Sequence, residues 1–142
     1  MKLMIMMGSQ TNEGVMQESP NWLQRFGIEN EIIVTSAHTN PDMISRLMVN
    51  AKQNGSGNVI AAAGMAAYTS QPVQLQDGLP DGIDALQHIE QMPAGLPVGT
   101  LAVGKAGARN AAVRAARIFA LSDPAIAIKV EAFKTQGYML AA

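Results

Sequence analysis

Five apolar residues, LMIMM at positions 3–7, are followed by Gly8 and Ser9 and set the architecture of the chain. A continuous apolar run with no alternating polar residue is typical of a strand that is covered on both faces. The capping residues QTNE at 10–13 then predict a helix that runs to about Phe26. We expect Pro20 to kink or split that helix and Gly27 to end it. A buried strand followed by a helix is the first unit of an α/β fold.

The same order recurs twice along the first half of the chain. Residues 32–35 (IIVT) predict a second buried strand, and Asn40-Pro41-Asp42 predicts the start of a second helix. Residues 59–63 (VIAAA) predict a third strand. Because strand–helix–strand connections are right-handed, this order predicts a three-layer, doubly wound parallel sheet of the flavodoxin or Rossmann type. The apolar stripe that faces the sheet from the second helix consists of Met43, Ile44, Leu47, Met48 and Ala51.

The second half of the chain has a weaker pattern. Residues 69–82 predict no element, residues 84–90 predict a short helix, and residues 98–103 predict a strand. A strong helix is expected at 108–121, and Ser122-Asp123-Pro124 caps a last helix that runs to about Gln136, with a ragged tail from Gly137. The length of 142 residues fits a single domain over residues 1–142.

Composition excludes several classes of partner. A net charge of −1 gives no electrostatic reason to bind nucleic acid or an acidic membrane. The absence of cysteine excludes disulfides and thiolate metal sites, and the first apolar run is too short for a signal segment or a membrane span. These features fit a cytoplasmic protein. A low charged fraction of 15% with much alanine and glycine also suggests that surface is buried by self-association.

His38 is the strongest candidate for chemistry from the residues themselves. It follows the second predicted strand, at the edge where open α/β sheets bind ligands, and histidine suits proton transfer near neutral pH. The structural alternative is a capping or core histidine. His88, the other histidine, fits a helix surface. The spacing from Gly99 to Lys105 imitates a phosphate-binding P-loop, but Ala106 stands where that motif requires Ser or Thr, so we reject this interpretation.

Four segments together resemble one family. They are MGSQTN at 7–12, SAHTNPD at 36–42, AGMAAY at 63–68, and QMPAGLPVGT at 91–100 continuing into VGKAGARNAA at 103–112. In this order they are similar to the class I N5-carboxyaminoimidazole ribonucleotide mutases of bacterial purine biosynthesis, the PurE family. The similarity spans nearly the whole chain, and its fourth segment is long and specific.

The resemblance implies an isomerase that needs neither a metal nor an organic cofactor. The carboxylate leaves N5 of the ribonucleotide as CO2, CO2 is captured at C4 of the imidazole, and His38 removes the C4 proton. Ser9 would meet the substrate phosphate, and the glycine- and alanine-rich third loop would approach the imidazole. The resemblance also implies a cytoplasmic homo-octamer with sites between subunits. The substrate-binding residues that it indicates are Gly8, Ser9, Asn12, Ser36, Thr39, Gly64, Met65, Ala66 and Tyr68.

Several positions depart from the family pattern. Asn12 replaces an aspartate that grips the ribose, and Thr39 replaces an arginine that binds phosphate. Met65 and Tyr68 stand where the third loop has a glycine and a second histidine. About a dozen residues are absent after Tyr68, so one helix–strand unit is expected to be missing. Either residues 72–75 take over a strand position, or the sheet closes differently, or the sequence omits residues of a longer chain.

These departures leave two functions open. The first is the mutase, with the direct carboxylation of the aminoimidazole ribonucleotide as a related reaction that the fourth segment disfavours. The second is a catalytically degenerate or repurposed scaffold that keeps the oligomer but no longer binds the ribonucleotide tightly.

Overall fold

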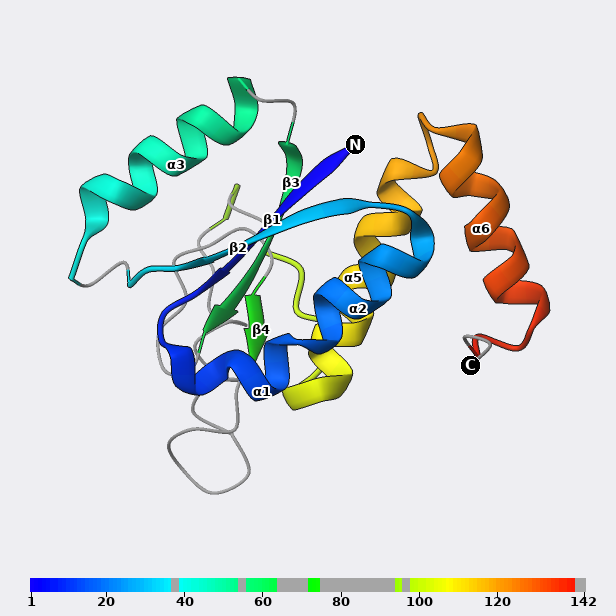
Figure 1. The fold of residues 1–142 in the computed structure, drawn as a ribbon, viewed down its shortest axis with the longest axis horizontal. Coiled ribbons are helices and arrows are strands. Elements are labelled where there is room, and N and C mark those ends of the chain that lie inside the picture. Colours follow the sequence, from blue (N-terminus) through cyan, green and yellow to red (C-terminus); the bar gives the residue numbers. More distant parts are fainter. Residues whose placement is uncertain (37–38, 54–55, 64–71, 75–93, 96–97, 140–142) are drawn as a thin grey trace.

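A parallel sheet forms the centre of the molecule, in the strand order β2-β1-β3-β4. The computed structural model describes residues 1–36, 39–53, 56–63, 72–74, 94–95 and 98–139. Within them the strands are β1 (Lys2–Met7), β2 (Glu29–Val34), β3 (Ser56–Ala63) and β4 (Pro72–Gln74). The predicted doubly wound α/β architecture is confirmed, with helices on both faces of the sheet (Figure 1).

β1 is the central strand, and its side chains alternate between the two faces. Leu3, Ile5 and Met7 pack into one core, while Met4 and Met6 pack into the other. All five are buried, as the apolar run predicted. The register places Met7 opposite both Val34 and Ala62, so β1, β2 and β3 end side by side.

One face of the sheet, which we call the α5 face, carries the larger core. It is covered by the short helix η1 (Gln10–Asn12), α1 (Glu13–Met16), α2 (Glu18–Phe26) and α5 (Gly104–Phe119), with α6 (Pro124–Thr135) packed outside α2 and α5. Figure 1 shows α6 on the side of the molecule opposite the carboxyl end of β1. The small residues on the buried stripe of α5 let this helix approach α2 and the sheet closely; they are Ala108, Ala111, Ala112, Ala115 and Ala116.

The predicted first helix is split, as Pro20 requires. Proline has no N–H to donate to the carbonyl of residue 16, four positions earlier, so it fits only within a first turn. The helix accordingly breaks at Gln17, and Pro20 lies in the first turn of α2. Gly27 ends α2 with φ of 76°, and the Ile28 N–H donates to the Leu23 carbonyl at 2.9 Å, which is a Schellman motif.

The opposite face, the α3 face, has a smaller core. α3 (Pro41–Gln53) begins where Asn40-Pro41 predicted, because the Asn40 side chain caps the Met43 N–H at 3.2 Å. Ala51 is buried against the sheet, and Ile44, Leu47 and Met48 are half-buried. Met43, the remaining residue of the predicted stripe, is 40% exposed.

Three predictions need correction. β2 is not a buried strand: it lies at the sheet edge, and Ile32 and Val34 are 39% and 42% exposed. Residues 98–103 form no strand apart from an isolated bridge at Val103. β4 was missed, and it pairs in parallel with β3 over Ala61–Ala63. Thus Pro72–Gln74 takes a strand position, in line with the first of the three explanations for the short middle of the chain.

The last helix was predicted correctly. Asp123 caps α6 by accepting hydrogen bonds from the N–H groups of Ala125 and Ile126, and Pro124 occupies the first turn. The expected ragged tail is ordered at Tyr138, which packs against Phe133. The helix expected at 84–90 lies outside the described residues.

Candidate functional site

The carboxyl edge of the sheet brings two of the predicted site loops together. The Thr35 N–H donates to the Met7 carbonyl at 2.9 Å, so the chain leaving β2 stays beside the end of β1. Gly8 and Ser9 follow β1 directly, and Ser36 follows Thr35. β3 ends at the same edge, immediately before the third predicted loop. Ligands of open α/β sheets bind at this edge, so the topology supports the predicted location of the site.

Ser9 forms the turn from β1 into η1. Its backbone is extended (φ −153°, ψ 149°), and its hydroxyl oxygen accepts from the Thr11 N–H at 3.3 Å and from the Thr11 hydroxyl at 2.9 Å. The capping role considered from the sequence is therefore present. Two accepted bonds use both lone pairs of the oxygen, which leaves the hydroxyl proton of this exposed residue to be donated elsewhere. A Cβ added to the neighbouring Gly8 would meet nothing within 4 Å, so the space beside Ser9 is open.

Asn12 is a buried polar residue at the same edge. It is 8% exposed, and its N–H donates to the Ser9 carbonyl at 3.2 Å. Its side chain makes no capping hydrogen bond to α1, although Asn12 occupies the cap position. The amide is thus placed beside Ser9 by the backbone of η1 and not by a bond of its own to the helix.

The second loop is closed by backbone and side-chain bonds on both sides of residues 37–38. The Asn40 N–H donates to the Ser36 carbonyl at 2.9 Å, and the Asn40 amide and the Thr35 hydroxyl approach the Met43 sulfur at 3.6 and 3.7 Å. Thr39 is exposed at the start of α3. Ser36 and Thr39 therefore share the edge with Ser9, as predicted.

The other predicted site residues fall outside the described part of the chain. These are the catalytic candidate His38 and the third-loop residues Gly64, Met65, Ala66 and Tyr68. Their roles stay predictions. Among the described residues, no group of three or more His, Cys, Asp or Glu side chains could hold a metal ion. No helix in the described part of the chain is long and apolar enough to span a membrane.

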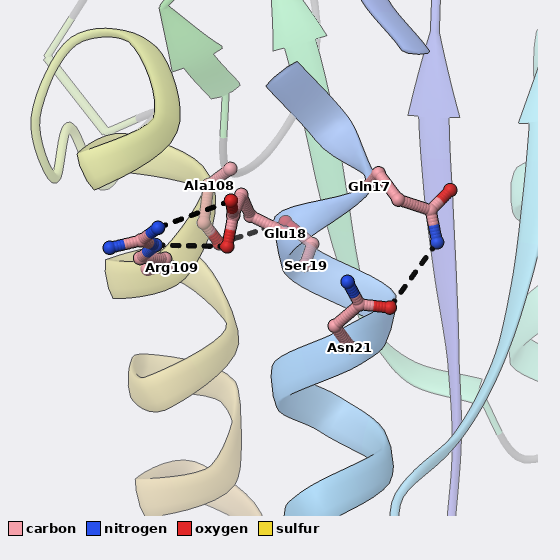
Figure 2. A network of polar contacts seen from close by, with 6 residues as sticks. All are labelled: Gln17, Glu18, Ser19, Asn21, Ala108 and Arg109. Atoms are coloured by element: carbon pink, nitrogen blue, oxygen red, sulfur yellow. Dashed lines mark hydrogen bonds and ion pairs between the residues drawn. The ribbon is translucent and has the colours of Figure 1, made fainter. Parts of the chain in front are cut away.

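A polar clasp that the sequence did not reveal holds the helices next to this edge. Glu18, at the start of α2, accepts two hydrogen bonds from Arg109 on α5, at 2.9 and 3.1 Å (Figure 2). The adjacent Ser19 is fully buried, and its hydroxyl donates to the Ala108 carbonyl at 2.8 Å. The partners are 89 and 91 residues apart in sequence, so no local pattern could have indicated the clasp.

The clasp changes the acidity of Glu18. The hydrogen bonds from Arg109 hold the pKa of this carboxyl below its usual 4.5, and they outweigh partial burial, which acts in the opposite direction. The positive charges of Arg109 and Lys105 lower the pKa further. The same hydrogen bonds raise the pKa of Arg109. Both groups therefore stay charged near neutral pH, and the first turns of α2 and α5 stay joined beside the sheet edge.

Known proteins with similar sequences and folds are enzymes of one kind. Residues 2–138 match the family model described as AIR carboxylase. The N5-carboxyaminoimidazole ribonucleotide mutase of Vibrio vulnificus is 42% identical over 147 residues, covering 96% of this chain and 91% of that protein. The Escherichia coli K12 mutase is 39% identical over 133 residues, covering 86% and 79%. The crystal structure of Treponema denticola PurE superposes with a TM-score of 0.81 at 25% identity, covering 96% and 91%.

The lengths of these matches bear on the short middle of the chain. The span matched to the Vibrio vulnificus protein, 147 residues, is longer than the 142 residues present here. Some residues of that relative therefore have no counterpart in this sequence, as the missing helix–strand unit predicted. The strand ends nevertheless keep their arrangement, and the match runs from β1 through α6. On the strength of the family model and of relatives that align along almost its entire length, this chain belongs to the AIR carboxylase family.

Proposed function

We propose that this protein is an N5-carboxyaminoimidazole ribonucleotide mutase of purine biosynthesis. The observation that carries the proposal is the 42% identity to a curated mutase over 96% of the chain. The grouping of the first two predicted loops at the carboxyl edge of the sheet supports it, because that edge is where such folds bind nucleotides. The competing interpretation, a scaffold that no longer binds the ribonucleotide, is retained as an outcome of the experiment below.

In the proposed reaction the bond between N5 and the carboxylate carbon breaks, and CO2 is released within the site. A new bond then forms between C4 of the imidazole and the CO2 carbon. The C4 proton leaves to His38, which restores the aromatic ring. An imidazole with an ordinary pKa near 6.5 is suited to accept this proton at neutral pH.

We assign the substrate phosphate to the edge formed by Gly8, Ser9, Ser36 and Thr39. Ser9 has one hydroxyl proton left after accepting its two hydrogen bonds, so it can donate to a phosphate oxygen. The open space beside Gly8 lets the phosphate approach the backbone. Asn12 would contact the ribose as a neutral amide, and Gly64, Met65, Ala66 and Tyr68 would line the imidazole side.

The proposal includes a cytoplasmic homo-oligomer, an octamer by the family resemblance. The support in this chain is the α3 face, where four large apolar side chains are at least 39% exposed. They are Ile32, Val34, Met43 and Val49. Burying such side chains between subunits would stabilise the assembly by about 25 cal/mol for each Å² of apolar surface removed from water. Light scattering on the eluting protein would give the number of subunits.

The direct test follows the ultraviolet absorbance of the 4-carboxy product after N5-carboxyaminoimidazole ribonucleotide is added. We expect turnover by the wild type and a loss of about 10²–10⁴-fold in kcat for His38→Asn, since a positioned proton-transfer group contributes that much. His88→Asn is the matched control, because it removes the only other histidine, and it should retain activity. A folded wild-type protein without turnover would favour the scaffold.

Thr39 offers a gain-of-function test of the phosphate position. It is exposed at the sheet edge and stands where the resemblance places an arginine. Thr39→Arg should add a charge-assisted hydrogen bond to phosphate, worth about 1.5–3 kcal/mol. The KM for the ribonucleotide should therefore fall at least about tenfold. An unchanged KM would show that the phosphate lies elsewhere.

A further inference from the structure

A second cavity lies away from the strand ends, between α5 and the end of α6. Its volume is about 450 Å³, within the range of small-molecule sites in proteins. Trp22 of α2, Phe133 of α6 and Tyr138 form its aromatic wall. None of these residues belongs to the loops assigned to the ribonucleotide, so the cavity is separate from the proposed active site.

The aromatic wall is fixed by the end of α6. The Tyr138 N–H donates to the Phe133 carbonyl at 3.0 Å, and the Gly137 N–H donates to the Lys134 carbonyl at 3.1 Å, which completes a Schellman motif. Tyr138 adopts φ of 62°, which is uncommon for a bulky residue. Its ring lies 5.6 Å from that of Phe133, and Trp22 contacts Phe133 at 5.7 Å, both edge to face. The wall is therefore held in place before any ligand binds.

Two guanidinium groups line the same cavity. Arg114 and Arg117 are three residues apart on α5, so they project from one side of the helix. Neither forms an ion pair with another described residue, and no acidic side chain lines the cavity. Arg109, earlier on the same helix, differs because Glu18 neutralises it. The cavity therefore holds two positive charges that the described part of the protein leaves uncompensated.

Their surroundings orient these arginines toward a flat ligand. The Arg117 guanidinium carbon lies 5.9 Å from the centre of the Tyr138 ring. A Cβ added to Gly99 would lie 3.3 Å from the Arg114 guanidinium carbon, so glycine at this position makes room for that side chain. Asn110, also in the lining, donates to the Leu101 carbonyl at 3.0 Å and keeps its amide oxygen as an acceptor.

From this arrangement we propose that the cavity binds a planar heteroaromatic ring that carries a phosphate, as in a nucleoside monophosphate. Guanidinium groups bind phosphate oxygens in a bidentate manner, which the pair Arg114 and Arg117 provides. The ring of the ligand packs against Phe133 and Tyr138, and Asn110 accepts a hydrogen bond from the ring edge. The proposal goes beyond the mutase reaction and does not depend on it.

Trp22 allows a test that reports on this cavity. It is the only tryptophan in the chain, so its fluorescence changes when a ligand enters beside it. Titration with 5′-AMP should give a saturable change, with the affinity checked by calorimetry. Adenosine lacks the phosphate and ribose 5-phosphate lacks the ring, so each should bind at least about tenfold more weakly, a difference of about 1.4 kcal/mol.

Variants separate this cavity from the strand-end site. Arg114→Gln and Arg117→Gln should each weaken 5′-AMP binding at least about tenfold. Both residues are exposed, so the variants should fold, and Tyr138→Ala provides an independent third loss of affinity. Arg46→Gln on α3 is the matched control, and it should bind as the wild type does, as should Ser9→Ala.

Three results would overturn the proposal: no binding of 5′-AMP at millimolar concentration, equal binding of adenosine, or unchanged affinity in the arginine and Tyr138 variants. Loss of the fluorescence change in Ser9→Ala would also count against it, since the signal would then come from the strand ends. Because no measurement here uses turnover, failure of the mutase assay leaves the result of this test unaffected.

Discussion

The two faces of the sheet are built differently. On the α5 face, sixteen buried residues form one core, and Glu18, Ser19 and Arg109 join two of its helices. On the α3 face, five buried residues lie under a single helix, and Met43 and Val49 of that helix are 40% and 59% exposed. The described part of the chain thus completes the first core by itself and leaves the second open. This difference indicates that stability comes from the α5 face and that the α3 face is available for assembly.

The largest effect should come from emptying the α5 core. Phe26 is 1% exposed and packs edge to face on Phe133 at 5.6 Å. Phe26→Ala should lower the free energy of unfolding by about 3–5 kcal/mol, because it removes a buried ring and leaves a cavity. Urea denaturation followed by circular dichroism measures this loss.

Val49→Ala on the α3 face is the contrasting variant. Its side chain is 59% exposed, so the change in stability of the monomer should stay within about 0.5 kcal/mol. If the two variants were equally destabilised, the contrast between the faces would be wrong.

A smaller effect is expected at the end of α2. Gly27 has φ of 76°, and a Cβ there would contact the ammonium group of Lys129 from α6. Gly27→Ala should therefore destabilise the protein by about 1 kcal/mol or more through backbone strain. Gly14→Ala, in α1, is the control: a Cβ there meets nothing within 4 Å, and alanine favours the helix by up to about 1 kcal/mol. The two thermal midpoints should move in opposite directions.

The smallest effect should come from the clasp, and it depends on pH. Because the folded pKa of Glu18 lies below its usual 4.5, its contribution is fully present above about pH 4.5 and disappears as the pH falls through the folded value. Glu18→Gln should therefore have a lower urea midpoint than the wild type at pH 7, and the two should converge at pH 3.

Glu131→Gln is the control for that experiment. It removes a 3.5 Å pair with Lys134 in which both side chains are more than half exposed, and exposed pairs of this kind contribute little. A pH-independent difference between Glu18→Gln and the wild type would show that the carboxylate charge is not what matters at the clasp.

Local patterns predicted the elements whose cause is local. The apolar run of β1, the Asn40-Pro41 start of α3 and the Asp123 cap of α6 each depend on neighbouring residues, and each is confirmed. The exposure of β2 depends on its place in the strand order, which an apolar run cannot reveal. β4 is only three residues long and begins with proline, so its pattern is too short to recognise. Residues 98–103 are apolar enough for a strand but lack strand pairing.

The site was predicted with the same limits. The placement of Ser9, Ser36 and Thr39 at one edge follows from the strand–helix order, and the structure confirms it. The polar clasp and the cavity of Arg114 and Arg117 depend on contacts between residues far apart in sequence. The sequence noted the three arginines of α5 as a group, but only the fold shows that Glu18 neutralises one and that two face aromatic rings.

The long reach of the α5 core has a consequence during synthesis. Half of its buried residues lie in α5 and α6, whereas Leu23 and Phe26 emerge from the ribosome early. At about 5–20 residues per second, the roughly eighty residues between Phe26 and Ala108 take roughly 4–16 s to translate. Throughout that interval the nascent chain presents an apolar surface that has no helix to cover it. A chaperone that shields short apolar segments would therefore act on the first third of this protein before its last third exists.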